Sequence, residues 1–184
     1  MQYILPSIRL WLVTFFVCVV LYTALILGFA QGVTPYSANG SIITVEGKAV
    51  GSELVAQKFT NPRYFWPRPS TPDYNAMGAA GSNKSPTSPD LTARAQETIA
   101  AYGATATNPI PADLVAASGG GLDPHISLAG ALYQVDRVAE ARGLTPAAIK
   151  QLVESQSTSV GGTLAPERIV NVLELNLALD RLEQ

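Results

Sequence analysis

Hydrophobic residues are concentrated near the start of the chain, in a run from residue 10 to residue 29 that contains no charged side chain. A helix rises about 1.5 Å per residue, so this run matches a hydrocarbon layer about 30 Å thick. A helix also satisfies its own backbone hydrogen bonds in lipid. Trp11 lies near the first interface, where aromatic anchors are frequent. The pattern predicts a transmembrane helix over residues 10–30.

The flanking charges indicate an orientation for this helix. Arg9 and the N-terminal amine precede the apolar run, whereas the next charges after it, Glu46 and Lys48, cancel. The positive-inside bias places residues 1–9 in the cytoplasm and residues 31–184 outside it. A cleaved signal peptide ending near Ala30 is the alternative, but its apolar region is usually only about 7–15 residues long. Ala24 and Gly28 form a small-xxx-small pair that would let another helix approach closely.

The remaining pattern predicts one α+β domain over residues 31–184, rich in helix and with a few short strands. Apolar periodicity and capping residues predict helices over 52–59, 91–102 and 127–142, and another that starts at Thr145-Pro146. A strand is expected at 41–45, and a long ordered loop at 60–90. Residues 112–118 fit a helical turn or a short strand. Residues 170–183 favour helix, with a strand as the alternative.

Composition excludes several classes of site and partner. The formal net charge is −2, which gives no indication of a nucleic-acid partner. Cys18 and His125 are the only residues of their types. No intrachain disulfide can form, and no His/Cys metal cage can be built from this chain alone. We therefore expect no metal site.

Residues 78–85 resemble a phosphate-binding loop, but Asn83 stands where the pattern needs glycine. No strand is predicted before this stretch, and Pro86 and Pro89 follow it. A glycine-serine turn is the favoured interpretation.

Residues 118–127 bring Ser118, Asp123 and His125 close together in the sequence. One interpretation is a hydrolytic or anion-binding site. However, a nucleophile needs a base that is oriented by a third group, and neighbours on one loop rarely give that geometry. The favoured interpretation is that Asp123 or Ser127 caps the next helix and that His125 is a turn residue.

The stretch that holds Tyr64, Phe65, Trp66 and Arg68 has the composition of a protein interface, and equally that of a packed, proline-stiffened loop. The carboxylates are scattered and form no recognisable acid/base pair; Glu174 and Asp180 are expected on a solvated helix face. No catalytic residue is identified.

Several sequence blocks together resemble the C subunit of the Kdp potassium-transporting ATPase, the KdpC family. The similarity runs in order from the membrane helix to the C-terminus, and its blocks are residues 51–59, 64–70, 81–83, 118–126, 134–142 and 170–180. The matching positions include Ser82, Asn83, Gln134, Arg137, Asn171 and Asn176. The chain departs from the family pattern at Lys84, Ser85 and Gly120.

This resemblance implies an accessory subunit in a bacterial inner-membrane complex. The implied partners are a channel-like K⁺-translocating subunit, a P-type ATPase subunit and membrane lipid. The implied roles are to stabilise the assembly and to raise the ATP affinity of the pump subunit, or to modulate K⁺ entry. No tightly bound cofactor is expected, and ATP would act through the pump subunit. A domain outside the membrane cannot touch cytoplasmic ATP, so the assembly role is favoured. A membrane-anchored hydrolase that uses residues 118–125 is the alternative.

Overall fold

The computed structural model describes residues 3–161 and 167–182. The chain divides into two compact units, residues 1–49 and residues 50–184, here called the helix unit and the C-terminal unit. Each is described by itself.

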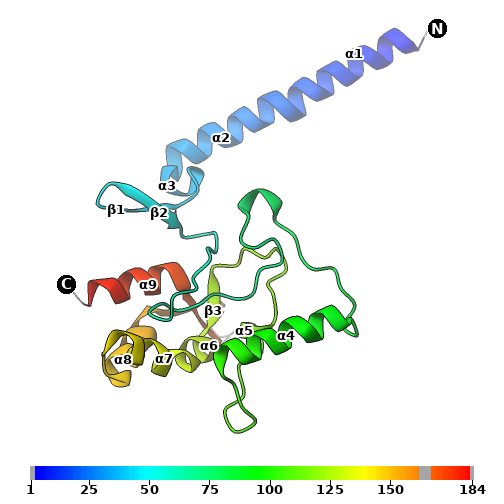
Figure 1. The fold of residues 1–184 in the computed structure, drawn as a ribbon. Coiled ribbons are helices and arrows are strands. Elements are labelled where there is room, and N and C mark those ends of the chain that lie inside the picture. Colours follow the sequence, from blue (N-terminus) through cyan, green and yellow to red (C-terminus); the bar gives the residue numbers. More distant parts are fainter. Residues whose placement is uncertain (1–2, 162–166, 183–184) are drawn as a thin grey trace. The chain divides into compact units, whose positions relative to one another are not determined.

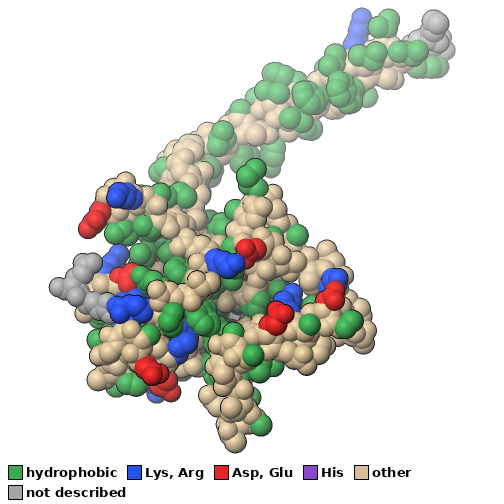
Figure 2. Space-filling model, viewed as in Figure 1, with side chains coloured by type: hydrophobic (Ala, Val, Ile, Leu, Met, Phe, Trp, Pro, Cys, Tyr) green, Lys and Arg blue, Asp and Glu red, His purple; other side chains and the backbone are tan. Residues whose placement is uncertain are grey.

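The helix unit begins with one long apolar helix. α1 (Ile4–Phe15), the π-helical segment η1 (Phe16–Leu21) and α2 (Tyr22–Val33) are continuous. None of their described residues is buried, and large apolar side chains are exposed along the whole helix. Figure 2 shows them on the face in view. Residues Ile4–Val33 are long and apolar enough to cross a membrane, by length and composition. A helix that is apolar on all sides needs lipid or other helices around it.

A short turn and a β-hairpin follow this helix. α3 (Pro35–Ala38) is one helical turn, and β1 (Ile42–Val45) pairs with β2 (Lys48–Ser52). Glu46 and Gly47 connect the strands with φ values of 50° and 77°. Two positive φ values in a two-residue connection match the twist that hairpins prefer. The strand expected at residues 41–45 is confirmed.

The C-terminal unit contains most of the helices (Figure 1). Its longer helices are α4 (Pro89–Tyr102), α7 (Val135–Arg142), α8 (Pro146–Gln156) and α9 (Val172–Arg181), and its shorter ones are α5 (Ala112–Val115) and α6 (Leu128–Tyr133). A single 3₁₀ turn, η2 (Ala76–Gly78), interrupts the long loop before α4. Helix with a few short strands is the composition that the sequence predicts.

One small antiparallel sheet joins distant parts of this unit. β5 (Arg168–Asn171) lies between β3 (His125–Ser127) and β4 (Ser157–Ser159). The register pairs Ile126 with Val170, and Ser157 also with Val170. The central strand therefore ties the start of α6 to the end of α8.

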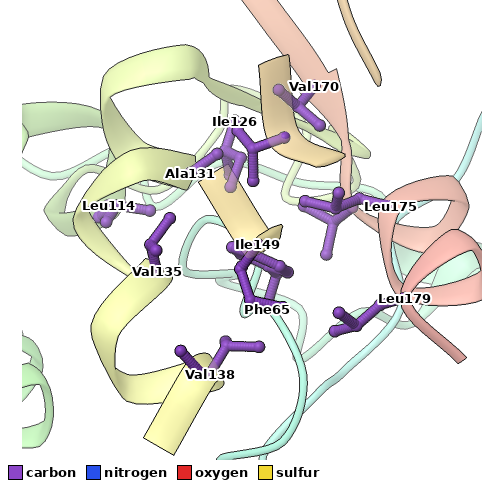
Figure 3. Packing of buried hydrophobic residues seen from close by; sticks show 13 residues of the cluster. Phe65, Leu114, Ile126, Ala131, Val135, Val138, Ile149, Val170, Leu175 and Leu179 are labelled. Carbon is purple, nitrogen blue, oxygen red and sulfur yellow. The ribbon is translucent and has the colours of Figure 1, made fainter. Parts of the chain in front are cut away.

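Phe65 enters the hydrophobic core from the long loop. It is fully buried and belongs to a cluster with Leu114, Ile126, Val138 and Leu175 (Figure 3). Burying a side chain of this size stabilises a fold by about 1.5–3 kcal/mol. The loop is thus part of the folded core.

Three predicted elements differ from the structure. Residues 52–59 do not form a helix: Ser52 ends β2, and the Ala56 N–H donates to Leu122 O (2.9 Å) instead of to a helical neighbour. The helix predicted over 127–142 is broken at Gln134 into α6 and α7. Residues 170–183, for which helix was favoured and a strand was the alternative, begin in the strand β5 and continue as the helix α9. The predicted end at Glu183 lies outside the described residues.

Candidate functional site

Two buried amide side chains hold the main chain of the aromatic segment, residues 64–66. Asn176 Oδ1 accepts from the Phe65 N–H (2.8 Å), and Asn176 Nδ2 donates to Phe65 O (3.0 Å). Gln134 repeats this pattern on Trp66, accepting from its N–H (2.8 Å) and donating to its carbonyl (3.1 Å). Each amide replaces the partners that a neighbouring strand would provide. They come from α9 and from the junction of α6 and α7.

Two arginines complete the support of this segment. Arg137 Nη1 donates to Pro62 O (2.7 Å) and to Tyr64 O (3.0 Å). Arg142, whose side chain is 1% exposed, donates from Nε to Arg63 O (2.7 Å) and from Nη2 to Asp180 (2.7 Å). Burial lowers the pKa of Arg137 to about 10, so it remains charged at neutral pH. Both guanidinium groups therefore bind carbonyl oxygens of the loop main chain.

The aromatic rings pack on these same groups. The Arg137 guanidinium lies 3.9 Å from the centroid of the Trp66 ring, and Tyr102 meets that ring edge-on at 5.2 Å. Tyr64 stacks under Arg142 at 5.0 Å and donates its hydroxyl to Asp180 (3.1 Å). Burial, and then the hydrogen bond to Asp180, raise the pKa of Tyr64. These rings therefore pack within the unit, as the second of the two interpretations expects, while the interface interpretation stays a prediction.

A second cluster centres on Asp123. Its Oδ2 accepts from Arg68 Nη1 (3.1 Å), and its Oδ1 accepts from the His125 N–H (3.0 Å) and lies 3.3 Å from His125 Nδ1. Hydrogen bonding to His125 keeps the pKa of Asp123 below its usual value, against the opposing effect of burial. Arg68 also donates to the carbonyls of Ala116 and Ala117. The cluster ties the proline-rich loop to residues 116–125.

This cluster lacks the arrangement of a hydrolase. Ser118 is buried, and its Oγ accepts from the Asp123 N–H (3.4 Å). Within the described residues, no hydrogen bond joins Ser118 to His125, so no base faces the hydroxyl. The carboxylate instead orders the turn, and Ser127 caps α6 by accepting from the Gly130 N–H (2.8 Å).

The other predicted positions lie apart from both clusters. Asn171 caps α9 by accepting from the N–H groups of Leu173 (3.1 Å) and Glu174 (3.2 Å), and it donates to Glu53 O (2.8 Å). Ser82 and Asn83 lie in the long loop, with no helix starting directly after them, so the phosphate-loop geometry is not formed. Ala24 and Gly28 lie on α2, and nothing within the described residues comes within 4 Å of a Cβ placed on Gly28.

Sequence reasoning missed two members of the first cluster. Asp180 was expected on a solvated helix face, and its side chain is 40% exposed, but its contacts with Arg142 and Tyr64 were not foreseen. Arg142 was not among the candidate residues. The only sequence signal for either is their presence in the family-like blocks, because their partners lie 116 and 79 positions away in the chain.

The surface beside Trp66 is hollowed but mainly apolar. A depression of about 350 Å³ is lined by Phe59, Trp66, Tyr74 and Tyr102 among others, with Lys58, Thr60 and Thr98 as its polar members. No group of three or more His, Cys, Asp or Glu residues that could hold a metal ion occurs in residues 3–161 and 167–182. The two clusters bind main-chain groups of residues 62–66 and of residues 116–125.

The chain thus combines an apolar N-terminal helix, long enough to cross a membrane, with a helix-rich unit whose candidate polar residues bind its own main chain. The family model of KdpC, described as "K+-transporting ATPase, c chain", matches residues 4–181. The chain belongs to this family, which is that of an accessory subunit and not of the catalytic one.

Relatives over the full length agree. A protein of *Parvibaculum lavamentivorans* named potassium-transporting ATPase KdpC subunit is 58% identical over 184 residues, covering 100% of this chain and 98% of the relative. Proteins of the same name from *Burkholderia cenocepacia* and *Geotalea uraniireducens* are 46% and 44% identical, and cover 95% and 100% of this chain. The similarity includes the apolar helix as well as the C-terminal unit.

Proposed function

We propose that this chain is a non-catalytic subunit that stabilises a potassium-transporting ATPase. In this proposal the apolar helix anchors it in a bacterial inner membrane. Residues 1–9 face the cytoplasm, and residues 31–184 form the extracytoplasmic part. Its partners are a channel-like K⁺-translocating subunit and a P-type pump subunit.

The observation that carries the proposal is that the polar candidate residues hydrogen-bond to the main chain of the loop. Asn176, Gln134 and Arg137 direct their hydrogen-bonding groups at the main chain of residues 62–66. An enzyme needs some of its polar groups presented to a substrate. Here they hold a proline-rich loop in one conformation, which suits a surface that is read by a protein partner.

The resemblance also implies raised ATP affinity in the pump subunit, or modulated K⁺ entry. In the proposed orientation the C-terminal unit and cytoplasmic ATP are on opposite sides of the membrane. Any effect on ATP must then pass through the pump subunit, whereas an effect on K⁺ entry can be direct. Measuring KM for ATP and for K⁺ with and without this chain separates the two.

Deletion of the chain tests the assembly role. The complex is purified through a tag on the pump subunit, from cells with and without this chain. We expect deletion to abolish co-purification of the channel-like subunit or K⁺-stimulated ATPase activity, and the full chain to restore both. Normal assembly and transport without the chain would refute the proposal. His125→Ala is the control for the hydrolase alternative, and we expect it to retain activity.

A further inference from the structure

The long loop of the C-terminal unit presents an arm, residues 72–83, that extends away from the unit's other elements (Figure 1). Its base is fixed against residues 118–121. The Ala80 N–H donates to Gly120 O (3.0 Å), and a Cβ on Gly81 would come within 2.7 Å of Gly119 O. On the other stem, a Cβ on Gly121 would overlap the Pro72 ring. Both stems are therefore in tight contact with one glycine-rich turn.

The tip of the arm is ordered by its own hydrogen bonds. Asn75 Oδ1 accepts from the Met77 N–H (3.0 Å), and Asn75 O accepts from the Gly78 N–H (3.0 Å). These bonds form the 3₁₀ turn η2. Met77 is 99% exposed at this turn. A fixed loop that holds a large apolar side chain entirely in solvent loses little conformational freedom on binding a partner.

The surroundings of Met77 are uncharged and small. Residues 74–83 contain no charged side chain, and Ala76, Gly78 and Ala79 flank Met77. The nearest charges in sequence are already paired, Asp73 with Lys58 (2.8 Å) and Lys84 with Asp90 (2.7 Å). Small neighbours allow close approach of another surface, and the absence of charge avoids a desolvation penalty there.

We propose that Met77 is an anchor that inserts into an apolar pocket on another subunit of the ATPase. This inference rests on the proposed function, because it needs a partner subunit. Lipid is a poorer match: one methionine without Trp or Phe beside it, and without unpaired basic residues, lacks the apolar area and the charge that surface binding to membranes uses. An unbranched, polarisable side chain on a rigid loop suits a preformed protein pocket.

Exchange of the full chain in the purified complex tests the proposal. The release rate of each variant is measured after adding excess tagged wild-type chain. We expect Met77→Ala to raise this rate about 10- to 100-fold, the equivalent of losing one buried side chain. Met77→Lys should release faster still, and Met77→Leu should stay within a few fold of wild type. Val160→Lys is the matched control, because Val160 is also highly exposed (76%).

Two results would overturn the proposal that Met77 is an anchor. One is release of Met77→Lys at the wild-type rate, and the other is release of Val160→Lys as fast as that of Met77→Lys. Unfolding of each isolated full chain in detergent shows whether a variant is misfolded. If Met77→Lys is misfolded, Met77→Ala takes its place, and release of Met77→Ala at the wild-type rate overturns the proposal. A photo-reactive benzoylphenylalanine at position 77 should crosslink to another subunit, and crosslinking only to lipid, or none, contradicts the proposal. If Met77 variants behave as wild type while deletion still abolishes assembly, only the anchor fails and the proposed function stands.

Discussion

The residue that best shows how this unit is held together is Asn176. It is 2% exposed and binds both main-chain groups of Phe65. Phe65 in turn fills the core between α5, α7 and α9. A polar side chain thus determines where an apolar one is buried. The cost of removing it comes from the backbone groups that it leaves unpaired as well as from the lost side chain.

Asn176→Ala should lower the free energy of unfolding by about 2–4 kcal/mol, because two buried main-chain groups lose their partners. Chemical denaturation of the full chain in detergent, followed by circular dichroism, measures the loss. Glu174→Gln is the control, since Glu174 is exposed on the same helix. A loss below about 1 kcal/mol for Asn176→Ala would show that water replaces the amide, and that the loop does not depend on it.

At the scale of elements, the glycine-rich turn at residues 118–121 provides a matched pair of glycines. Gly121 has a φ of +71°, and a Cβ there would overlap Pro72. Gly120 has nothing within 4 Å of such a Cβ. The open space at Gly120 can hold a larger side chain. Of these two neighbours, only Gly121 needs to be glycine.

Gly121→Ala should destabilise the C-terminal unit by about 2–4 kcal/mol, through left-handed strain and overlap with the proline ring. Gly120→Ala should change stability by less than about 0.5 kcal/mol, as a surface substitution does. The two denaturation midpoints are compared in the full chain. Equal midpoints would mean that the stem of the arm at Pro72 moves freely, and would also weaken the case for a fixed Met77.

Elements with local signals could be predicted from the sequence. Gly103 and Gly143 end α4 and α7 in the left-handed conformation, and Thr145 caps α8. The sheet could not be predicted, because Ile126 and Ser157 both pair with Val170, far along the chain. The break at Gln134 was missed for the same reason: its side chain serves Trp66, 68 positions earlier. The family-like blocks named Gln134, Arg137 and Asn176 but not their common target.

At the scale of the whole molecule, membrane orientation decides what each unit can reach. Arg9 is the only charged side chain before the apolar run, and it favours a cytoplasmic N-terminus. Only with this orientation can the C-terminal unit lie on the side from which K⁺ enters. The same orientation keeps it from touching cytoplasmic ATP. The roles proposed for the chain therefore depend on one topological fact.

Single-cysteine labelling measures that fact directly, because Cys18 is the chain's only cysteine. In a Cys18→Ser background, Ser155→Cys places a thiol at an exposed position of α8, and Ser7→Cys places one in the predicted cytoplasmic segment. In right-side-out spheroplasts, a membrane-impermeant maleimide should label position 155 at once and position 7 only after lysis. The reversed result would place the C-terminal unit in the cytosol and make direct contact with ATP the better hypothesis. Recovery of a soluble chain trimmed near Ala30 would instead identify the apolar run as a signal peptide, since an intact helix of this length and hydrophobicity should stay with the membrane.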